Sequence, residues 1–437
     1  MTEARRAFVL GGGVAGLVAA FGLADRGFEV TLLESRRRCG GRAFSTEDRV
    51  AGRELDNGFH VMLGCYRATR ALCRRLGTED GFQQDRTLQM RYRFVGGRAT
   101  SLSLSRLPVP LAMPWGVLGL DLSCGERLRA LLGMGSVLLG APRSWTFADW
   151  LRRRRQLGAP DDVMWRPLCR AVMNCEPEDA SAAGFLATLR EAFLGRASAA
   201  AFWVPKRPWG ALLGAPAPAA LEAAGVELRV GARVADLELA GGRVAAVTLA
   251  DGERLAVGAA DVVVSALPWF SLGRVLGDAA PAPFAQLRSA PIVTAYFDVV
   301  DGTPPPDDGP VVALVGARPF HFVLRTPGDD PQRFAVLSGG DRGLDGMSVA
   351  EIAAVARAQL GDYYDGLDLE RAQVRIRKEQ HATFVPDPDS ESRRPRPGRL
   401  DGGPTNLLVC GDWTDTGFPA TLEGAARSSE QLLASLR

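Results

Sequence analysis

The residues best suited to chemistry lie near the N-terminus, where Gly11, Gly13 and Gly16 follow a short apolar segment. Their G-x-G-x-x-G spacing is typical of the turn that holds the pyrophosphate of a dinucleotide. Gly11 permits a tight turn, Gly13 presents no Cβ to a phosphate, and Gly16 allows a helix to pack closely on a strand. Because the chain contains 50 glycines, this spacing carries weight only if the flanking elements agree with it.

The flanking residues predict the strand–turn–helix–strand unit that such a turn requires. Residues 7–10 indicate a buried strand, residues 14–24 carry apolar side chains at helical spacing, and residues 28–33 indicate a second strand. Free N–H groups at the start of the helix would attract phosphates. Glu34 follows the second strand, where its carboxylate can accept both hydroxyls of an adenosine ribose and would repel a 2′-phosphate. We therefore expect FAD or NAD, and not NADP.

The composition describes a globular chain long enough for two or three domains. Of its 437 residues, 46% are hydrophobic and 23% charged, and 52 basic against 50 acidic residues give a net charge of +2. This balance gives no support for a nucleic-acid partner. Seven cysteines without C-x-x-C spacing and only three histidines indicate reduced, mostly buried thiols in a cytosolic protein. We expect no metal site.

Two loops place further polar residues near the predicted turn. Residues 35–42 form a basic, glycine-rich segment directly beyond the second strand, so Arg42 is expected to reach the same phosphates. A solvated basic loop is the alternative for this segment. Residues 56–58, Asp-Asn-Gly, predict a turn, and His60 follows it.

The segment from residue 91 to residue 155 changes character and leaves two interpretations open. Residues 102–113 and 115–139 are apolar with few charges, and residues 152–155 are four consecutive arginines. This pattern suits a lid over an apolar substrate or a face resting on a membrane. It equally suits core helices with a solvated arginine face. No apolar run is long enough to span a bilayer and the first strand starts too early for a signal peptide, so we expect a cytoplasmic protein, with peripheral contact to the membrane kept open.

The rest of the chain predicts a mixture of strands and helices. A three-stranded meander is expected over residues 226–230, 234–239 and 244–249, and further strands over residues 261–266, 293–299, 311–315 and 334–337. Helices are expected within residues 174–195 and 349–360, and a surface loop rich in Pro and Arg over residues 393–399.

The C-terminal residues indicate a return to the nucleotide-binding region. Residues 406–410 predict a buried strand that ends in Gly411 and Asp412, and Thr421 can cap a last helix over residues 422–436. A second helix N-terminus would then face the cofactor.

Two motifs, together with the block from Gly11 to Arg42, resemble a known family. They are D-N-G-F-H-V-M-L-G-C-Y at residues 56–66 and G-D-W-T-D-T-G-F-P-A-T-L-E-G-A at residues 411–425. They resemble the FAD-dependent amine oxidase and phytoene desaturase superfamily, and in finer detail the hydroxysqualene dehydroxylases. Phe59 stands where that family usually has Gln, and Phe418 where it usually has Trp. Both are expected to line the flavin or substrate region; Phe418 keeps an aromatic wall, whereas Phe59 removes an amide.

The resemblance implies an α/β fold, with a Rossmann-like FAD-binding domain of the glutathione-reductase-2 type and an interleaved α+β substrate domain. The FAD-binding segments would be 1–88, 206–272 and 395–437, and the substrate segments 89–205, which includes the lid, and 273–394. The implied FAD contacts are Gly11, Gly13, Val14, Ala15, Gly16, Glu34, Ser35, Gly41, Arg42, Val234, Gly411, Asp412, Ala420, Thr421 and Leu422.

Each part of FAD has its own contacts in this implied map. Gly11, Gly13, Gly16 and Arg42 would meet the pyrophosphate, and the backbone of Val234 the adenine. Asp412 would accept a ribityl hydroxyl. N–H groups at residues 420–422 would face the N1–O2 edge of the flavin, which becomes negative on reduction. Cys410 is expected to be a small buried residue, with a covalent flavin link as the alternative.

The implied reaction is the reductive loss of an allylic hydroxyl from hydroxysqualene, giving squalene and water. The substrate would lie in an apolar tunnel, and His60 would lie near the leaving hydroxyl, unless it is a structural histidine. The nearest alternative is a carotenoid or phytoene desaturase, in which hydride moves in the opposite direction. An amine oxidase is less favoured, and a non-catalytic prenyl-lipid carrier, as in the Rab escort proteins, would be expected to have an eroded flavin site.

Overall fold

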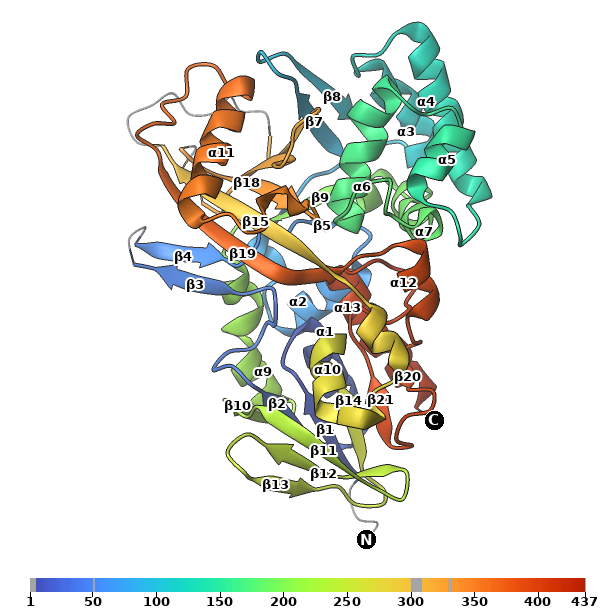
Figure 1. Cartoon of the computed structure of the whole chain (residues 1–437), viewed down its shortest axis with the longest axis vertical. Coiled ribbons are helices and arrows are strands. Elements are labelled where there is room, and N and C mark those ends of the chain that lie inside the picture. Colours follow the sequence, from blue (N-terminus) through green and yellow to red (C-terminus); the bar gives the residue numbers. More distant parts are fainter. Residues whose placement is uncertain (1–4, 50–51, 300–308, 329, 331, 437) are drawn as a thin grey trace.

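The fold is organised around a six-stranded sheet that gathers strands from both ends and the middle of the chain (Figure 1). The computed structural model describes residues 5–49, 52–299, 309–328, 330 and 332–436. The strand order is β10 (Glu227–Val230), β2 (Glu29–Glu34), β1 (Arg6–Leu10), β14 (Val262–Ser265), β21 (Leu407–Val409) and β20 (Gly398–Arg399). All neighbours are parallel except β20 and β21.

Alternating side chains of this sheet bury both of its faces. Ala7 and Val9 of β1 pack towards α1 (Val14–Ala24), which lies beside α13 (Leu422–Ser435), α2 (Arg67–Arg75) and α9 (Ala217–Ala223). Phe8 and Leu10 point to the opposite face, which is covered by α10 (Trp269–Leu276) and by a small sheet of β11 (Val234–Ala240), β12 (Arg243–Leu249) and β13 (Arg254–Ala256). The predicted strand–turn–helix–strand unit is therefore confirmed.

The predicted three-stranded meander is wrong in its first strand. Residues 227–230 form β10, which pairs in parallel with β2 at the edge of the six-stranded sheet. The third strand of the small sheet is instead β13. A short alternating segment can pair with the free edge of more than one sheet. Here residues 227–230 pair with the edge of β2.

A second, seven-stranded sheet lies above the first, in the order β19 (Gln373–Phe384), β15 (Ser289–Asp298), β18 (Arg333–Gly339), β17 (Phe322–Arg325), β16 (Val311–Leu314), β7 (Gln89–Arg93) and β8 (Ala99–Ser103) (Figure 1). Helix α11 (Val349–Tyr363) covers one face of this sheet. The strands predicted at residues 293–299, 311–315 and 334–337 and the helix at 349–360 are confirmed. The other four strands were not predicted, because their alternation is weak or interrupted by charges.

A group of helices covers the other face of the second sheet and forms the upper right of Figure 1. It comprises α3 (Val109–Leu118), α4 (Cys124–Ser136), α5 (Phe147–Arg153), α6 (Arg166–Met173), α7 (Ala182–Phe193) and α8 (Ala197–Ala200). Capping boxes start α4 at Ser123 and α5 at Thr146. Within the described residues, no helix is both long and apolar enough to cross a membrane.

The structure divides the apolar middle segment into a buried part and an exposed part. Trp150 is fully buried in an aromatic cluster with Phe147 and Trp165, at ring-centroid distances of 5.3 and 5.2 Å. The outward faces of α3 and α4, in contrast, expose leucines and Trp115 to solvent. The core interpretation therefore fits α5. The exposed apolar side chains lie on α3, on α4 and on the segments beside them, and their role as a lid or a membrane-resting face stays a prediction.

The predicted surface loop at residues 393–399 is wrong in one important respect. Arg393 ends the short helix α12 (Pro388–Arg393), and Arg394 is buried. Its guanidinium donates hydrogen bonds to the carbonyl oxygens of Asp412, Trp413, Thr414 and Phe418, which fixes the C-terminal loop.

The remaining elements are short. They are β3 (Ser45–Asp48), β4 (Arg53–Asp56), β5 (Met62–Leu63), β6 (Phe82–Gln84), β9 (Phe202–Pro205), the 3₁₀ turns Glu79–Gly81, Val137–Leu139, Gly277–Ala279, Ala282–Gln286 and Arg342–Leu344, and the π-helical turns Asp161–Trp165 and Gly210–Gly214.

Candidate cofactor and substrate site

A cavity of about 1,020 Å³ lies between the two sheets and is lined by both. One end lies at the carboxyl ends of β1 and β2, which is where ligands bind in open parallel sheets. The other end lies between the seven-stranded sheet and helices α6 and α7. The sequence-predicted residues that line it are Gly11, Gly13, Val14, Ala15, Glu34, Ser35, Gly41, Arg42, Phe59, His60, Val234, Gly411, Asp412, Ala420, Thr421 and Leu422.

The turn after β1 is shaped by contacts that only glycine allows. Gly11 has a φ of +100°, in the region that glycine favours. A Cβ on Gly41 would lie 2.9 Å from Cα of Gly13, and a Cβ on Gly16 would lie 1.8 Å from the carbonyl oxygen of Gly11. Gly16 does not line the cavity, so we correct its implied contact with the pyrophosphate: this glycine serves helix packing.

Glu34 is buried at the end of β2 and is held by the backbone. Its Oε2 accepts the N–H of Gly12 at 2.7 Å, and its Oε1 accepts the N–H of Arg36 at 2.8 Å. The Ser35 hydroxyl also donates to Oε1, at 3.2 Å. A carboxylate has about four acceptor positions, so the two N–H bonds fix its orientation, and a pair of ligand hydroxyls would use the free position and the one that the Ser35 hydroxyl occupies. This arrangement fits the diol of an adenosine ribose.

Arg42 and Asp412, predicted from opposite ends of the chain, form an ion pair in the cavity wall. Arg42 also donates to the carbonyl oxygen of Ala382 on β19 at 2.7 Å. Burial opposes the charge of Arg42, but Asp412 and Glu379 outweigh it, so the pKa of Arg42 is raised. A fixed, permanently charged guanidinium beside the glycine turn fits a pyrophosphate.

The N-terminus of α13 points its free backbone groups into the cavity. The Thr421 hydroxyl caps the helix by accepting the N–H of Gly424 at 3.0 Å, and residues 420–422 line the cavity. Glu423 turns away and accepts the N–H groups of Ala68 and Thr69, which ties α13 to α2. Diol acceptor, glycine cradle and helix N-terminus therefore form a set that fits FAD.

His60 lines the cavity within reach of the charge of Arg42. Its Nδ1 is buried and has no hydrogen-bond partner in the protein, and the ring packs edge-on against Trp209 at 5.9 Å. Burial lowers the pKa of His60 to about 4, against a backbone hydrogen bond to Gly58 that raises it, and the positive charge of Arg42 adds to the lowering. The imidazole is therefore neutral at pH 7, with a free ring nitrogen available to a ligand.

The far end of the cavity is apolar. Its wall is formed by Leu63, Tyr66, Leu88, Met90, Leu168, Ala171, Val172, Leu189, Ala192, Phe193, Phe202, Val311, Phe322, Leu324 and Leu337. Polar side chains that line the cavity near this wall form hydrogen bonds within the protein. Arg170 donates to Glu176 at 2.9 Å, Asn174 to Thr383 at 2.9 Å, and Thr188 to the carbonyl of Gly184 at 3.2 Å.

Phe418 does not form the aromatic wall that the resemblance implies. It is buried behind Tyr66, at a ring-centroid distance of 6.5 Å, with the Arg427 guanidinium 4.0 Å from its ring. Tyr66, which does line the cavity, takes its place. Cys410 is fully buried and does not line the cavity, and burial raises the pKa of its thiol to about 12, which agrees with a small core residue.

Sequence reasoning missed the part of the site that comes from β19 and α6. Glu379, His381, Ala382 and Thr383 line the cavity from a strand that was not predicted, and Arg170 and Asn174 do so from the end of α6. Tyr66 lay inside a quoted motif but was given no role. The sequence offered one hint, the loop expected around Glu176 and Pro177. In the structure α6 ends just before this loop, at Asn174, whose backbone is left-handed (φ 53°).

One group of potential metal ligands occurs within the described ranges, formed by Glu176, His321 and Asp341. Glu176 is already paired with Arg166, Arg170 and Arg318, at 2.8, 2.9 and 3.3 Å. Three guanidinium groups around one carboxylate oppose the binding of a cation, so this cluster is better described as an ion-pair network.

Comparison with known proteins agrees with this geometry. Residues 14–431 match the family of flavin containing amine oxidoreductases. The hydroxysqualene dehydroxylase of Rhodopseudomonas palustris is 29% identical over 97% of this chain and 96% of its own length. The 15-cis-phytoene desaturase of Narcissus pseudonarcissus is 28% identical over 40% of this chain and 32% of its own length.

A solved structure of an oxidoreductase from Methanosarcina mazei has the same fold. It superposes with a TM-score of 0.75 over 98% of this chain and all of its own, at 15% sequence identity. The predicted α/β fold class is confirmed. From residue 14 to residue 431 the chain belongs to the family of flavin containing amine oxidoreductases, and it is an FAD-dependent oxidoreductase.

Proposed function

We propose that this oxidoreductase removes an allylic hydroxyl from a long isoprenoid, with hydroxysqualene as the substrate and squalene and water as the products. The observation that carries the proposal is the apolar end of the cavity, whose polar side chains are bonded within the protein. A C30 hydrocarbon binds mainly by burial, at about 25 cal/mol per Å² of apolar surface. The similarity over nearly the whole chain to a hydroxysqualene dehydroxylase supports the same substrate.

The residues of the chain divide the work along the cavity. Reduced FAD, when bound there, would supply the hydride that replaces the hydroxyl. Glu34, Arg42 and the start of α13 hold the dinucleotide. The apolar wall aligns the isoprenoid and excludes water, and the departing hydroxyl takes up a proton and leaves as water.

His60 is our proposed partner for the departing hydroxyl, because it lines the cavity and its buried Nδ1 has no partner. As a neutral imidazole it can hold the hydroxyl by a hydrogen bond. Tyr66 is a second candidate: it lines the cavity, and burial raises the pKa of its phenol above the usual value, so that it keeps its proton. His60→Gln and Tyr66→Phe would separate them, because the variant that loses turnover but keeps flavin binding identifies the group.

The second candidate function is a carotenoid or phytoene-type desaturase, which the similarity to a phytoene desaturase over part of the chain favours. An apolar cavity suits both substrates, so the direction of hydride transfer distinguishes them. An amine oxidase is less favoured, because the cavity-lining acids, Glu34, Glu379 and Asp412, all have partners at or near the cofactor end. The intact cofactor end argues against a prenyl-lipid carrier.

An anaerobic experiment tests the proposal. The flavin is reduced with dithionite, hydroxysqualene is added under argon, and the visible spectrum and the hydrocarbon extract are followed. Flavin reoxidation with formation of squalene is the expected result. A reduced flavin that ignores hydroxysqualene, together with bleaching of the oxidised enzyme by phytoene or squalene, would overturn the proposal in favour of a desaturase.

We also propose that the protein meets its substrate at a membrane, as a peripheral protein at the cytoplasmic face. The substrate, a long isoprenoid alcohol, and the product, a hydrocarbon, are both water-insoluble and partition into a bilayer. Full recovery in the soluble fraction at low salt without detergent would contradict this location.

A further inference from the structure

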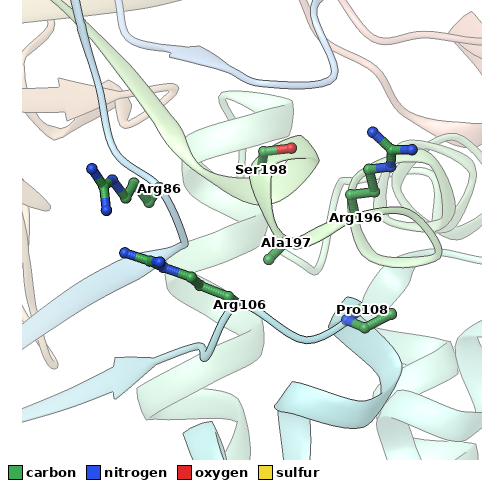
Figure 2. Close-up of a pocket in the computed structure, with 6 residues that line it drawn as sticks. All are labelled: Arg86, Arg106, Pro108, Arg196, Ala197 and Ser198. Atoms are coloured by element: carbon green, nitrogen blue, oxygen red, sulfur yellow. The ribbon is translucent and has the colours of Figure 1, made fainter.

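Three arginines from separate segments line a surface hollow outside the cavity. Arg86 precedes β7, Arg106 precedes α3, and Arg196 lies between α7 and α8; together with Pro108, Ala197 and Ser198 they line a hollow of about 530 Å³. In Figure 2 the side chains of Arg86 and Arg106 lie on one side of Ala197 and that of Arg196 on the other.

These arginines differ from most others in the protein because they have no internal partner. Arg86, Arg106 and Arg196 are exposed, and within the described part of the chain none of them forms an ion pair. The neighbouring Asp85 does not line the hollow. Three unneutralised guanidinium groups around one hollow repel one another and favour a bound anion, and guanidinium suits a phosphate in particular.

An exposed apolar face lies next to the hollow. On α3 and the loop before it, Leu107, Leu111, Trp115 and Leu118 are 48, 61, 67 and 52% exposed. On α4 and the turn after it, the exposed leucines are Leu128, Leu132, Leu138 and Leu139, with exposed fractions of 60, 66, 55 and 72%. Most of the large exposed hydrophobic side chains of the described residues belong to this region. Such a concentration marks an interaction surface.

The charge of the same region selects the partner. Residues 104–157 contain eight arginines, three acidic residues and no lysine, so this segment carries a surplus of positive charge larger than the net +2 of the whole chain. Exposed leucines and a Trp beside arginines are typical of a surface that enters the headgroup region of an anionic bilayer. Three arginines without an ion-pair partner at the edge of this face favour an anionic bilayer over a protein partner.

The hollow and the cavity share the segments that separate them. Arg86 lies two residues before Leu88, which lines the apolar end of the cavity, and Arg196 lies three residues after Phe193, which also lines it. Ala197 and Ser198 face the hollow, whereas Ala200 and Phe202 line the cavity. The anion-binding hollow therefore lies beside the apolar end of the site.

We propose that Arg86, Arg106 and Arg196 bind the phosphate of an anionic membrane phospholipid while the exposed faces of α3 and α4 enter the bilayer, so that the apolar end of the cavity is held at the membrane surface. The identity of the hydrocarbon delivered there rests on the proposed function; the binding of the phospholipid does not.

Vesicle flotation with the FAD-loaded enzyme tests this docking. The probes are vesicles of phosphatidylcholine alone and of phosphatidylcholine mixed with phosphatidylglycerol, at low and at high salt. The wild type is expected to bind the mixed vesicles more tightly, and less so at high salt. The triple variant Arg86→Gln, Arg106→Gln, Arg196→Gln is expected to lose about a hundredfold in affinity for mixed vesicles, at about tenfold or less per arginine.

A matched control removes the same charge elsewhere. Arg254→Gln, Arg342→Gln and Arg371→Gln alter three exposed arginines on other surfaces, and this control is expected to bind as the wild type does. Equal binding of the wild type to both kinds of vesicle, or equal loss in the control and the triple variant, would overturn the proposal. So would binding of inorganic phosphate by the hollow without any binding to vesicles.

Folding and turnover are followed in the same samples. The triple variant is expected to keep its flavin content and melting temperature, and to turn over detergent-dispersed hydroxysqualene at the wild-type rate. An enzyme that binds mixed vesicles through the arginines but does not convert hydroxysqualene would refute the proposed function and leave the docking intact. Turnover without arginine-dependent vesicle binding would refute the docking alone.

Discussion

The two ends of the cavity are built in opposite ways. At the cofactor end, backbone groups and fixed charges do the work: glycines that approach within van der Waals contact, a carboxylate held by two N–H groups, and an Arg42–Asp412 ion pair. At the substrate end, side chains from α6, α7 and strands β7, β16, β17 and β18 supply a wall without free polar groups. The difference shows that a polar ligand is recognised by hydrogen-bonding groups held at fixed positions. An apolar chain is recognised by a wall that offers no free hydrogen-bonding group.

The largest effect is expected at the cofactor end, where a single methyl group breaks the architecture. The Cβ of Gly16→Ala would lie 1.8 Å from the carbonyl oxygen of Gly11, so α1 must move off β1. We expect a loss of about 3 kcal/mol or more in the free energy of unfolding, with no retained FAD. Gly361→Ala in α11, where no atom lies within 4 Å of the added Cβ, is the control and should melt as the wild type does. Retained flavin in Gly16→Ala would show that the close packing is dispensable.

A second effect sharpens the boundary between the two ends and depends on pH. The pKa of His60 is about 4 in the folded protein against 6.5 when unfolded, so the unfolded state binds more protons between these values. Stability of the apoprotein should therefore fall as the pH drops from 6.5 to 4, by about 3 kcal/mol from this group. Urea unfolding of His60→Gln should lack this contribution.

Asp56 also makes the free energy of unfolding depend on pH, but with the opposite sign, so its contribution must be separated from that of His60. Burial raises its pKa to about 6, against hydrogen bonds from Ser45 and Trp209, so the folded state holds a proton between pH 3.8 and 6 that the unfolded state has lost. Its contribution falls as the pH rises through this window. The comparison of His60→Gln with the wild type cancels Asp56; an unchanged difference across pH 4 to 6.5 would show that His60 is not desolvated.

A third effect tests whether the ends are independent. Glu34→Gln places an amide N–H₂ against the N–H of Gly12 or Arg36 and leaves one acceptor fewer for the ribose. The dissociation constant for FAD is expected to rise tenfold to a hundredfold, corresponding to about 1.4–2.8 kcal/mol. Flavin-fluorescence titration measures it, and Glu227→Gln on the exposed edge strand β10 is the control. A changed Michaelis constant for the isoprenoid at saturating FAD would show that the ends are coupled.

The smallest effect is expected at the substrate end, where one hydroxyl enters the apolar wall. Val172→Thr keeps the shape of the side chain but presents an O–H to the hydrocarbon, and we expect kcat/KM to fall about fivefold, for about 1 kcal/mol. FAD affinity should stay as in the wild type. Val355→Thr, which makes the same change in α11 away from the cavity, is the control. An unchanged kcat/KM would place the substrate elsewhere.

The sequence predicted the cofactor end well because its residues act through local geometry. Gly11, Gly13 and Glu34 belong to one continuous unit, in which spacing alone sets the position of each group. Asp412 could be assigned because it directly follows a buried strand and a glycine. The boundaries of the five domain segments remain a prediction.

The substrate end could not be predicted because its contacts join distant segments. Asn174 bonds Thr383, and Tyr66 rather than Phe418 faces the cavity because Arg427 and Arg394 hold the Phe418 segment from behind. Nothing in residues 226–230 distinguishes an edge strand of one sheet from that of another. Such choices are decided by packing over hundreds of residues and leave no local pattern.

The insertion of β21 between β14 and β20 also orders events in time. Strands β1 and β2 and the glycine turn are synthesised first. The sheet gains its last strand, β21, only when residues 407–435 have left the ribosome, and the same residues bring Asp412 and the N-terminus of α13 to the cavity. Arg394 then fixes that segment through four carbonyl oxygens. A nascent chain thus carries its nucleotide-binding turn well before it has Asp412 and the N-terminus of α13, and we expect it to retain a flavin only after residues 407–435 have been synthesised.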